Sequence, residues 1–200
     1  MRDRIGWGLA LALGMMGSWL IGHGLWIPTK AVMAQWLLEE AWADTLQSQR
    51  LAKPWPWADT WPVGRLRLPH HGIDQIILAD ASGRSLAFGP GQVGNHRFPD
   101  GKRTLILSGH RDTHFSFVRN VQLGETLLVQ TLDGQWHHYT VGKTAILDSR
   151  TDQIAIHQPE GGLMLITCYP FDTLFPGGPL RYVIEAQKNT PVGKGIRNEE

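Results

Sequence analysis

The feature that most constrains the fold is a pattern in residues 63–200, where short apolar runs alternate with turn-forming residues. Gly, Pro and Asp gather between the runs, as in Asp-Ala-Ser-Gly at 80–83 and Pro-Gly-Gly-Pro at 176–179. No long helical pattern separates the runs. Short strands at this spacing favour an all-β barrel or sandwich. The segment is also long enough to bury one compact core.

The expected strands are runs of mostly apolar and β-branched residues that end at turn formers. They cover residues 65–68, 75–79, 85–88, 104–108, 126–131, 136–143, 163–167 and 182–186. The clearest hairpin turn is Asp133-Gly134, because an Asp-Gly pair suits the positive φ angles of a tight turn.

The amino-terminal part has a different character, since residues 5–27 contain no Asp, Glu, Lys or Arg. About 20 such residues match the hydrocarbon thickness of a bilayer. Trp7 and Trp26 lie near the two ends of the run, where an aromatic belt would put them. A cleaved signal peptide, with small residues at 32–34 as its cleavage site, is the alternative. The run exceeds the usual ~7–15 apolar residues of a signal peptide, which favours an uncleaved anchor.

The charges that flank this run predict its orientation. Arg2 and Arg4 precede it, and Lys30 lies on the other side. The positive-inside bias then puts the amino terminus in the cytoplasm and the rest of the chain outside the plasma membrane. We therefore expect a single-pass protein with a transmembrane helix in an anchor over residues 1–29.

The segment that follows the anchor is predicted to form a stalk. Between residues 30 and 52, apolar side chains repeat at steps of three and four, which is typical of a helix. The prolines at 54, 56 and 62 cannot continue a helix, and the residues between them include three tryptophans. We expect a helical stalk and a Pro/Trp linker over residues 30–62, and a separate domain over 63–200.

Charge and cysteine content exclude several functions. The chain has 19 Lys and Arg against 18 Asp and Glu, so it has no broad basic field for nucleic acid. A lone cysteine excludes an intrachain disulfide framework and a Cys-cluster zinc site. The pairs His70-His71 and His137-His138 invite a metal interpretation. Neighbouring strand residues point to opposite faces, however, and neither pair has obvious carboxylate partners, so we expect no metal.

Three chemically capable side chains each lie where a predicted strand meets a loop. Cys168 ends an apolar run and precedes Tyr-Pro, and proline cannot extend a central strand. His110 follows the run at 104–108, and Arg181 opens the run at 182–186. A catalytic thiol needs a proton partner and a charge stabiliser, because the thiolate is the nucleophile. Adjacent strand ends of a barrel would bring the three together, whereas an inert buried cysteine is the alternative.

These residues carry a resemblance to the sortase family of cysteine transpeptidases. The run Leu-Ile-Thr-Cys at 165–168, the arginine at 181 and Ser-Gly-His-Arg-Asp-Thr-His-Phe at 108–115 are similar to sortase motifs. The histidine motif, together with the amino-terminal anchor, is most similar to sortases of proteobacteria. Met164 departs from the family, since many sortases have Thr there. The resemblance covers most of residues 63–186 and implies a closed eight-stranded β-barrel with short helices.

The resemblance also implies an activity without a cofactor. Cys168 would attack the carbonyl after Thr in a Leu-Pro-x-Thr-Gly-like sorting signal at the carboxyl end of a protein substrate, forming a thioacyl-enzyme. His110 would exchange protons with the departing and the incoming amine, the latter being an acceptor in the cell envelope. Arg181 would stabilise the substrate oxygen. Imidazole and guanidinium suit these roles chemically.

Three further residues are candidates for contacts with substrate. His114 lies four positions after His110 and competes with it for the acid–base role. Asp112 could orient an imidazole, although an Asp that stabilises a turn is commoner. Thr167 could contribute through its backbone or hydroxyl, but a strand Thr needs no such role.

Two other functions remain as alternatives. A related cysteine peptidase would resolve the thioester with water instead of an amine. Papain-like enzymes place Cys before His, the reverse of the order here, and the caspase signature is absent. A tethered β-barrel that only binds a partner, with an inert Cys168, is the non-enzymatic alternative.

Overall fold

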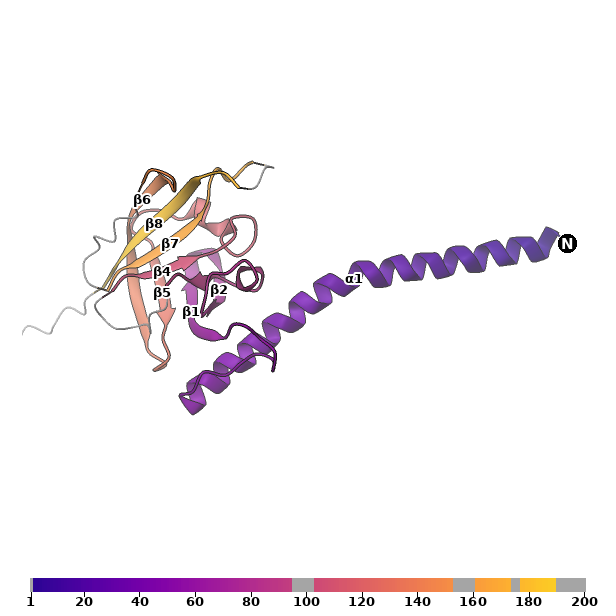
Figure 1. Cartoon of the computed structure of the whole chain (residues 1–200), viewed down its shortest axis with the longest axis horizontal. Helices are drawn as coiled ribbons and strands as arrows, with labels where there is room; N and C mark the ends of the chain where they lie inside the picture. Colours follow the sequence, from indigo (N-terminus) through magenta and orange to yellow (C-terminus); the bar gives the residue numbers. More distant parts are fainter. Residues whose placement is uncertain (1, 95–102, 153–160, 174–176, 190–200) are drawn as a thin grey trace, which may run out of the picture. The chain divides into compact units, whose positions relative to one another are not determined.

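The computed structural model describes residues 2–94, 103–152, 161–173 and 177–189. The chain divides into two compact units, Met1–Leu37 and Leu38–Glu200. The first consists of helix only, and the second carries the sheet (Figure 1).

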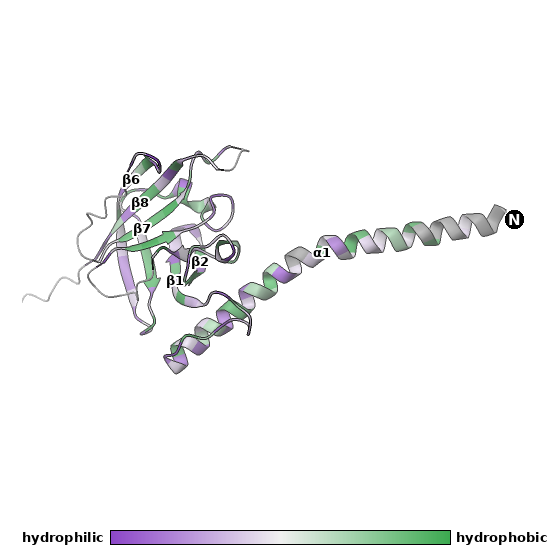
Figure 2. Ribbon diagram, viewed as in Figure 1, coloured by the Kyte–Doolittle hydropathy of each residue, from purple (hydrophilic) through white to green (hydrophobic). Residues whose placement is uncertain are grey.

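Helix α1 (Arg2–Ser48) replaces the two separate helices that we expected at the amino-terminal end, because it runs without a break from the anchor segment into the stalk. Within the first unit, large apolar side chains such as Trp19, Ile21 and Leu25 are exposed, and the colours of Figure 2 show apolar and polar residues mixed along the helix. In the part of the chain that the structure describes, no helix is both long and apolar enough to cross a membrane. The expected transmembrane helix therefore lacks support here.

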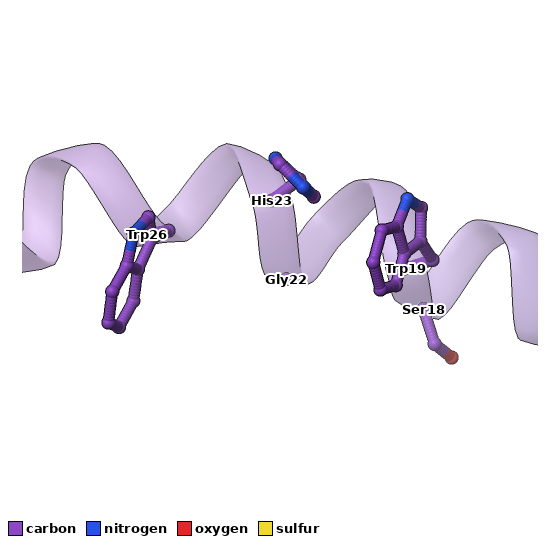
Figure 3. Close-up of a pocket in the computed structure, with 5 residues that line it drawn as sticks. All are labelled: Ser18, Trp19, Gly22, His23 and Trp26. Atoms are coloured by element: carbon purple, nitrogen blue, oxygen red, sulfur yellow. The ribbon is translucent and has the colours of Figure 1, made fainter.

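A shallow hollow on this helix lies between side chains one turn apart (Figure 3). The rings of Trp19 and His23 approach to 5.1 Å between centroids, and the ammonium of Lys30 lies 5.1 Å from the Trp26 ring. Contacts at a spacing of four residues are those that an isolated helix makes with itself. They support the helix and do not build a ligand site.

The second unit contains a closed barrel of eight strands, as the resemblance implied. The strands follow the order β1-β2-β3-β4-β7-β8-β6-β5 around the barrel. Two pairs, β2·β3 and β4·β7, are parallel, and the other pairs are antiparallel. The strands are β1 (Pro62–Leu68), β2 (Ile73–Leu78), β3 (Gly91–Gln92), β4 (Leu105–Ser108), β5 (Thr126–Gln130), β6 (Trp136–Asp148), β7 (Leu163–Cys168) and β8 (Leu180–Lys188). Short 3-10 helices cover Pro69–His71 (η1), Ser85–Ala87 (η2) and Ser116–Asn120 (η3).

The strand expected at 85–88 is wrong, because η2 occupies these residues. The Asp80 carboxylate accepts hydrogen bonds from the Ser82 amide and the Ser85 hydroxyl, each at 2.8 Å. Such side-chain bonds compete with the hydrogen-bond ladder of a sheet. The two-residue strand β3 follows instead, and a Cβ at Gly91 would overlap the carbonyl oxygen of Asp80. Only glycine fits this close approach.

The core fills the interior of the barrel with side chains that alternate along the strands. In β7, Leu163 and Leu165 point inward and pack against Leu107 of β4 and Ile184 of β8. Met164 and Ile166, which alternate with these leucines, form a separate cluster with Val183 of β8 on the opposite, outer face. Burial on both faces explains why β7 reads as a continuous apolar run rather than an alternating one.

The carboxyl end of α1 packs on the outside of the barrel. Within the second unit, Leu38 and Trp42 form a buried cluster with Ile76 and Leu78 of β2. The Trp42 indole donates a hydrogen bond to Gln130 Oε1 at 3.2 Å. The last turns of α1 are thus fixed by apolar burial and by a polar contact.

Candidate active site

Strand register puts Cys168 beside Arg181. Cys168 is the last residue of β7, and its partner in the antiparallel β8 is Arg181. Residues directly opposite each other in such a pair share a face, with Cβ atoms about 4.5–5.5 Å apart. Leu165 and Thr167 are buried, and successive side chains of a strand point to opposite faces, so Cys168 lies on the outer face of the barrel. Its partner Arg181 lies on the outer face as well.

His110 reaches the same end of the barrel through the neighbouring strand. β4 runs parallel to β7, and the last pair in register is Ser108 with Ile166. The Gly109 amide donates to the Ile166 carbonyl at 3.3 Å, so the two chains stay adjacent beyond this pair. His110 and Cys168 each lie two residues further along. The carboxyl ends of β4 and β7 and the amino end of β8, which are neighbours in the barrel (Figure 1), therefore place the three candidate residues at one end of the barrel.

The three side chains differ in exposure. His110 is exposed, while the free thiol of Cys168 and the side chain of Arg181 are half-buried. Arg181 Nη1 donates to the carbonyl oxygens of Gly178 and Leu180, at 2.7 and 2.9 Å. A guanidinium has five N–H groups, so these two bonds orient it and leave capacity for another acceptor.

A tight turn fixes the backbone of His110. Its carbonyl accepts hydrogen bonds from the amides of Thr113 and Phe115, at 3.3 and 2.9 Å. Phe115 is fully buried, and a Cβ at Gly109 would lie 2.6 Å from the Cγ atom of Phe115. Glycine before the histidine is therefore needed for this aromatic side chain to close the turn.

His114 lies in the same turn but has its own partners. Its Nε2 lies 3.4 Å from the carbonyl oxygen of Ala87, and its own carbonyl accepts a hydrogen bond from Gln75 at 2.9 Å. Burial lowers the pKa of His114, and a charge on His110 lowers it further, while the contact with Ala87 opposes both.

Thr167 and Asp112 have contacts within the protein. The buried hydroxyl of Thr167 donates to the Gly109 carbonyl at 2.7 Å, which ties β7 to the segment that precedes His110. Asp112 is exposed and accepts a hydrogen bond from Arg111 Nε at 3.1 Å. Roles of Thr167, Asp112 and His114 in substrate binding stay predictions.

The expectation that neither histidine pair has a carboxylate partner is wrong for His71, because its Nε2 lies 2.7 Å from Glu125 Oε2. His137 Nε2 lies 3.3 Å from the Thr131 hydroxyl. Among the described residues, no three His, Cys, Asp or Glu side chains gather as a metal site would require.

Sequence reasoning missed Arg111, whose side chain is only 7% exposed although it is charged. Its guanidinium donates to the carbonyl oxygens of Pro170 and Thr173, at 2.7 and 2.8 Å. The only signal for it was its place in the motif directly after His110.

Comparisons with known proteins agree with this architecture. A family model for the sortase domain matches residues 66–189. Sortase D of Bacillus subtilis (strain 168) is 30% identical over 128 residues, which cover 64% of this chain. The match also spans 64% of that protein, which is less than two thirds of its length.

Solved sortase structures share the fold at low sequence identity. The Clostridium perfringens sortase D5 transpeptidase superposes with a TM-score of 0.62 at 16% identity, covering 80% of this chain and 99% of that one. Sortase A from Corynebacterium diphtheriae gives a TM-score of 0.57 at 16% identity, covering 69% and 65%. These similarities identify the barrel as a sortase barrel.

Proposed function

This chain belongs to the sortase family of cysteine transpeptidases, and from that premise we propose that Cys168, His110 and Arg181 form its active site. The observation that carries the proposal is strand register: Cys168 pairs with Arg181 across β7 and β8, and His110 follows two residues after the last pair of β4 with β7. A nucleophile, a proton carrier and a fixed cation at one end of the barrel are what acyl transfer from a peptide requires.

In the first half of the reaction, the Cys168 thiolate attacks the carbonyl carbon of the scissile peptide bond. The oxyanion that forms accepts hydrogen bonds from the Arg181 guanidinium, whose charge persists at any physiological pH. The His110 imidazolium donates a proton to the leaving amine as the C–N bond breaks. The products are a thioester on Cys168 and a free amine.

In the second half, an amine acceptor attacks the thioester carbonyl and gives its proton to the His110 imidazole. Collapse of the tetrahedral intermediate breaks the C–S bond and restores the thiolate. The thioester keeps the acyl group activated, so a new amide can form without another energy source. We propose as substrate a protein that ends in a Leu-Pro-x-Thr-Gly-like sorting signal, cleaved after Thr.

We also propose that the chain groups with the proteobacterial sortases. Support comes from the run Gly-His-Arg-Asp-Thr-His-Phe at 109–115. The curated relative comes from Bacillus, so this subgroup rests on the motif alone.

The decisive experiment uses the full chain in detergent with a Leu-Pro-x-Thr-Gly peptide and a triglycine acceptor. Mass spectrometry should find a thioacyl adduct on Cys168 and a ligated product, and Cys168→Ala should abolish both while circular dichroism stays unchanged. The matched control, Leu123→Ala, changes an exposed side chain and should keep activity. Hydrolysed peptide alone would indicate a peptidase. Full activity in Cys168→Ala would overturn the active site.

Attachment to the plasma membrane, with the barrel on the extracytoplasmic side, is a further part of the proposal. Residues 5–27 lack charged side chains, and the exposed Leu20 and Ile21 would leave water on entering a bilayer. The test compares the full chain with residues 38–200 after membrane fractionation of the expressing cells, followed by protease treatment from outside. We expect the full chain to sediment with membranes and to be digested. A full chain that stays in the soluble fraction would contradict this proposal.

A further inference from the structure

Arg111 is a buried cation that the proposed reaction does not use. Its side chain is 7% exposed, and its neighbour Asp112, the carboxylate that it contacts, is 67% exposed. A buried guanidinium is costly unless hydrogen bonds satisfy it. The bonds from Nη1 to the Pro170 carbonyl and from Nη2 to the Thr173 carbonyl, at 2.7 and 2.8 Å, supply that compensation.

These bonds join two segments that are remote in the sequence. Arg111 directly follows His110, and its two acceptors lie in the segment that directly follows Cys168. Two nitrogens of one rigid fork fix both the distance and the angle between the segments, which a single bond could not do. Nothing in this contact needs a substrate, since both acceptors belong to the protein.

Arg119 provides an internal comparison. It reaches the same segment by pairing with Asp172 at 3.1 Å and by one long bond from Nη2 to the Phe171 carbonyl at 3.5 Å, and it lies over the Phe171 ring at 5.2 Å. Both partners of this ion pair are exposed, the Asp172 side chain by 90%, so water screens it. Arg119 therefore contacts the segment from the surface, while Arg111 holds it from inside.

We propose that Arg111 is a positioning residue, which sets the separation of the His110 imidazole and the Cys168 sulfur by clamping the Pro170–Thr173 backbone to the histidine turn. The inference rests on the proposed function, because only the proposed reaction requires the His110 imidazole and the Cys168 sulfur to act together. A displacement of about 1 Å between reacting groups can cost on the order of 10²-fold in rate. Loss of the clamp should thus lower kcat and leave KM almost unchanged.

The test measures how fast iodoacetamide alkylates Cys168, the only cysteine of the chain, as a function of pH. In the wild type, an adjacent imidazole should add a titration step that His110→Ala removes. Arg111→Met keeps an unbranched apolar stem but has no donors, and its profile should approach that of His110→Ala. Its kcat should fall on the order of 10- to 100-fold. Among the described residues, the ionisable side chains of His114, Asp112, Tyr169 and Arg181 stay unchanged in every variant.

A control, Arg119→Met, and a second variant, Arg111→Lys, distinguish a failure of the inference from a failure of the proposed function. Arg119→Met should keep the wild-type profile and kcat. Arg111→Lys retains the charge without the fork and should lie between wild type and Arg111→Met, which keeps the test usable if the methionine variant unfolds. A folded Arg111 variant with wild-type profile and kcat overturns the inference alone. An unchanged profile in His110→Ala instead overturns the pairing of His110 with Cys168 in the proposed function.

Discussion

Cys168 lies directly opposite Arg181 in the antiparallel pairing of β7 with β8, so both side chains leave the same face of the barrel. Arg181 is further oriented by its bonds to the Gly178 and Leu180 carbonyls. These two bonds hold the guanidinium in the absence of any substrate, and such preorganisation is what the proposed stabilisation of an oxyanion requires.

Replacing Arg181 should slow the acylation of Cys168 without changing the thiol itself. Arg181→Ala removes the proposed donor to the oxyanion and should lower kcat on the order of 10²- to 10³-fold. Arg181→Lys keeps the charge but not the fork, so we expect partial activity. Single-turnover mass spectrometry of the thioacyl adduct measures this step. Normal kinetics in Arg181→Lys would show that the forked hydrogen bonding plays no part.

Thr167→Val should destabilise the protein, because the buried hydroxyl is a donor to the Gly109 carbonyl. Loss of the donor leaves a buried acceptor unpaired, at a cost of about 1–3 kcal/mol. Thr167→Ser keeps the hydroxyl and is the matched control. Urea unfolding measures the change, and KM for the peptide should stay constant in the valine variant. A raised KM at unchanged stability would instead assign Thr167 to substrate binding.

Several features of the site could be predicted from the sequence, because they depend on apolar runs and on the residues that end them. The run that ends at Cys168 stops at a proline two residues later, and β7 ends at the cysteine. His110 follows an apolar run, which forms β4. Local apolar runs and turn formers were thus sufficient to find the strand ends. They could not find the parallel pairing of β4 with β7, since the paired Leu105 and Leu163 lie far apart in the chain.

Other structural features could not be predicted from the sequence, because they depend on contacts between residues that no local pattern reveals. Residues 85–88 have the composition of a strand, yet Asp80 holds the Ser82–Ser85 backbone in a turn through side-chain bonds. The two-residue β3 is too short for any periodicity. Arg111 binds backbone carbonyls of a remote segment, and such acceptors leave no pattern in the sequence.

Gly109→Ala should distort the histidine turn. The new Cβ would lie 2.6 Å from Phe115 Cγ, and overpacking of this kind costs about 1–3 kcal/mol. Gly142→Ala is the control, because the nearest atom to its Cβ is 3.9 Å away. The melting temperature is measured for both alanine variants and for the double variant Gly109→Ala, Phe115→Leu. The smaller leucine in the double variant should restore part of the stability that Gly109→Ala loses. Equal melting temperatures for the two alanine variants would contradict the close contact.

Asp74 should make stability depend on pH at the acidic end. Burial alone would raise the pKa of Asp74, but hydrogen bonds and charge from Arg65 and Arg67 outweigh it and lower the pKa below the ordinary 3.8. The stabilisation is therefore complete above the unfolded pKa and is lost as the pH falls through the folded value. Asp74→Asn should cost about 0.2–1 kcal/mol at pH 7, since the pair is partly exposed, and progressively less as the pH falls toward 2. Urea unfolding at both pH values tests this, and an equal loss at each would exclude an ionic cause.

Trp42 should contribute more to the stability of the barrel than any exposed tryptophan of the same helix. It is 2% exposed against Ile76 and Leu78, whereas Trp36 is 61% exposed. Trp42→Ala should cost about 3–5 kcal/mol, because a large cavity replaces the indole. Trp42→Phe should cost less, since it fills most of the space and loses only the bond to Gln130. Trp36→Ala is the control and should change the free energy of unfolding by less than about 0.5 kcal/mol. Equal effects of the two alanine substitutions would mean that the end of α1 does not pack on the barrel in solution.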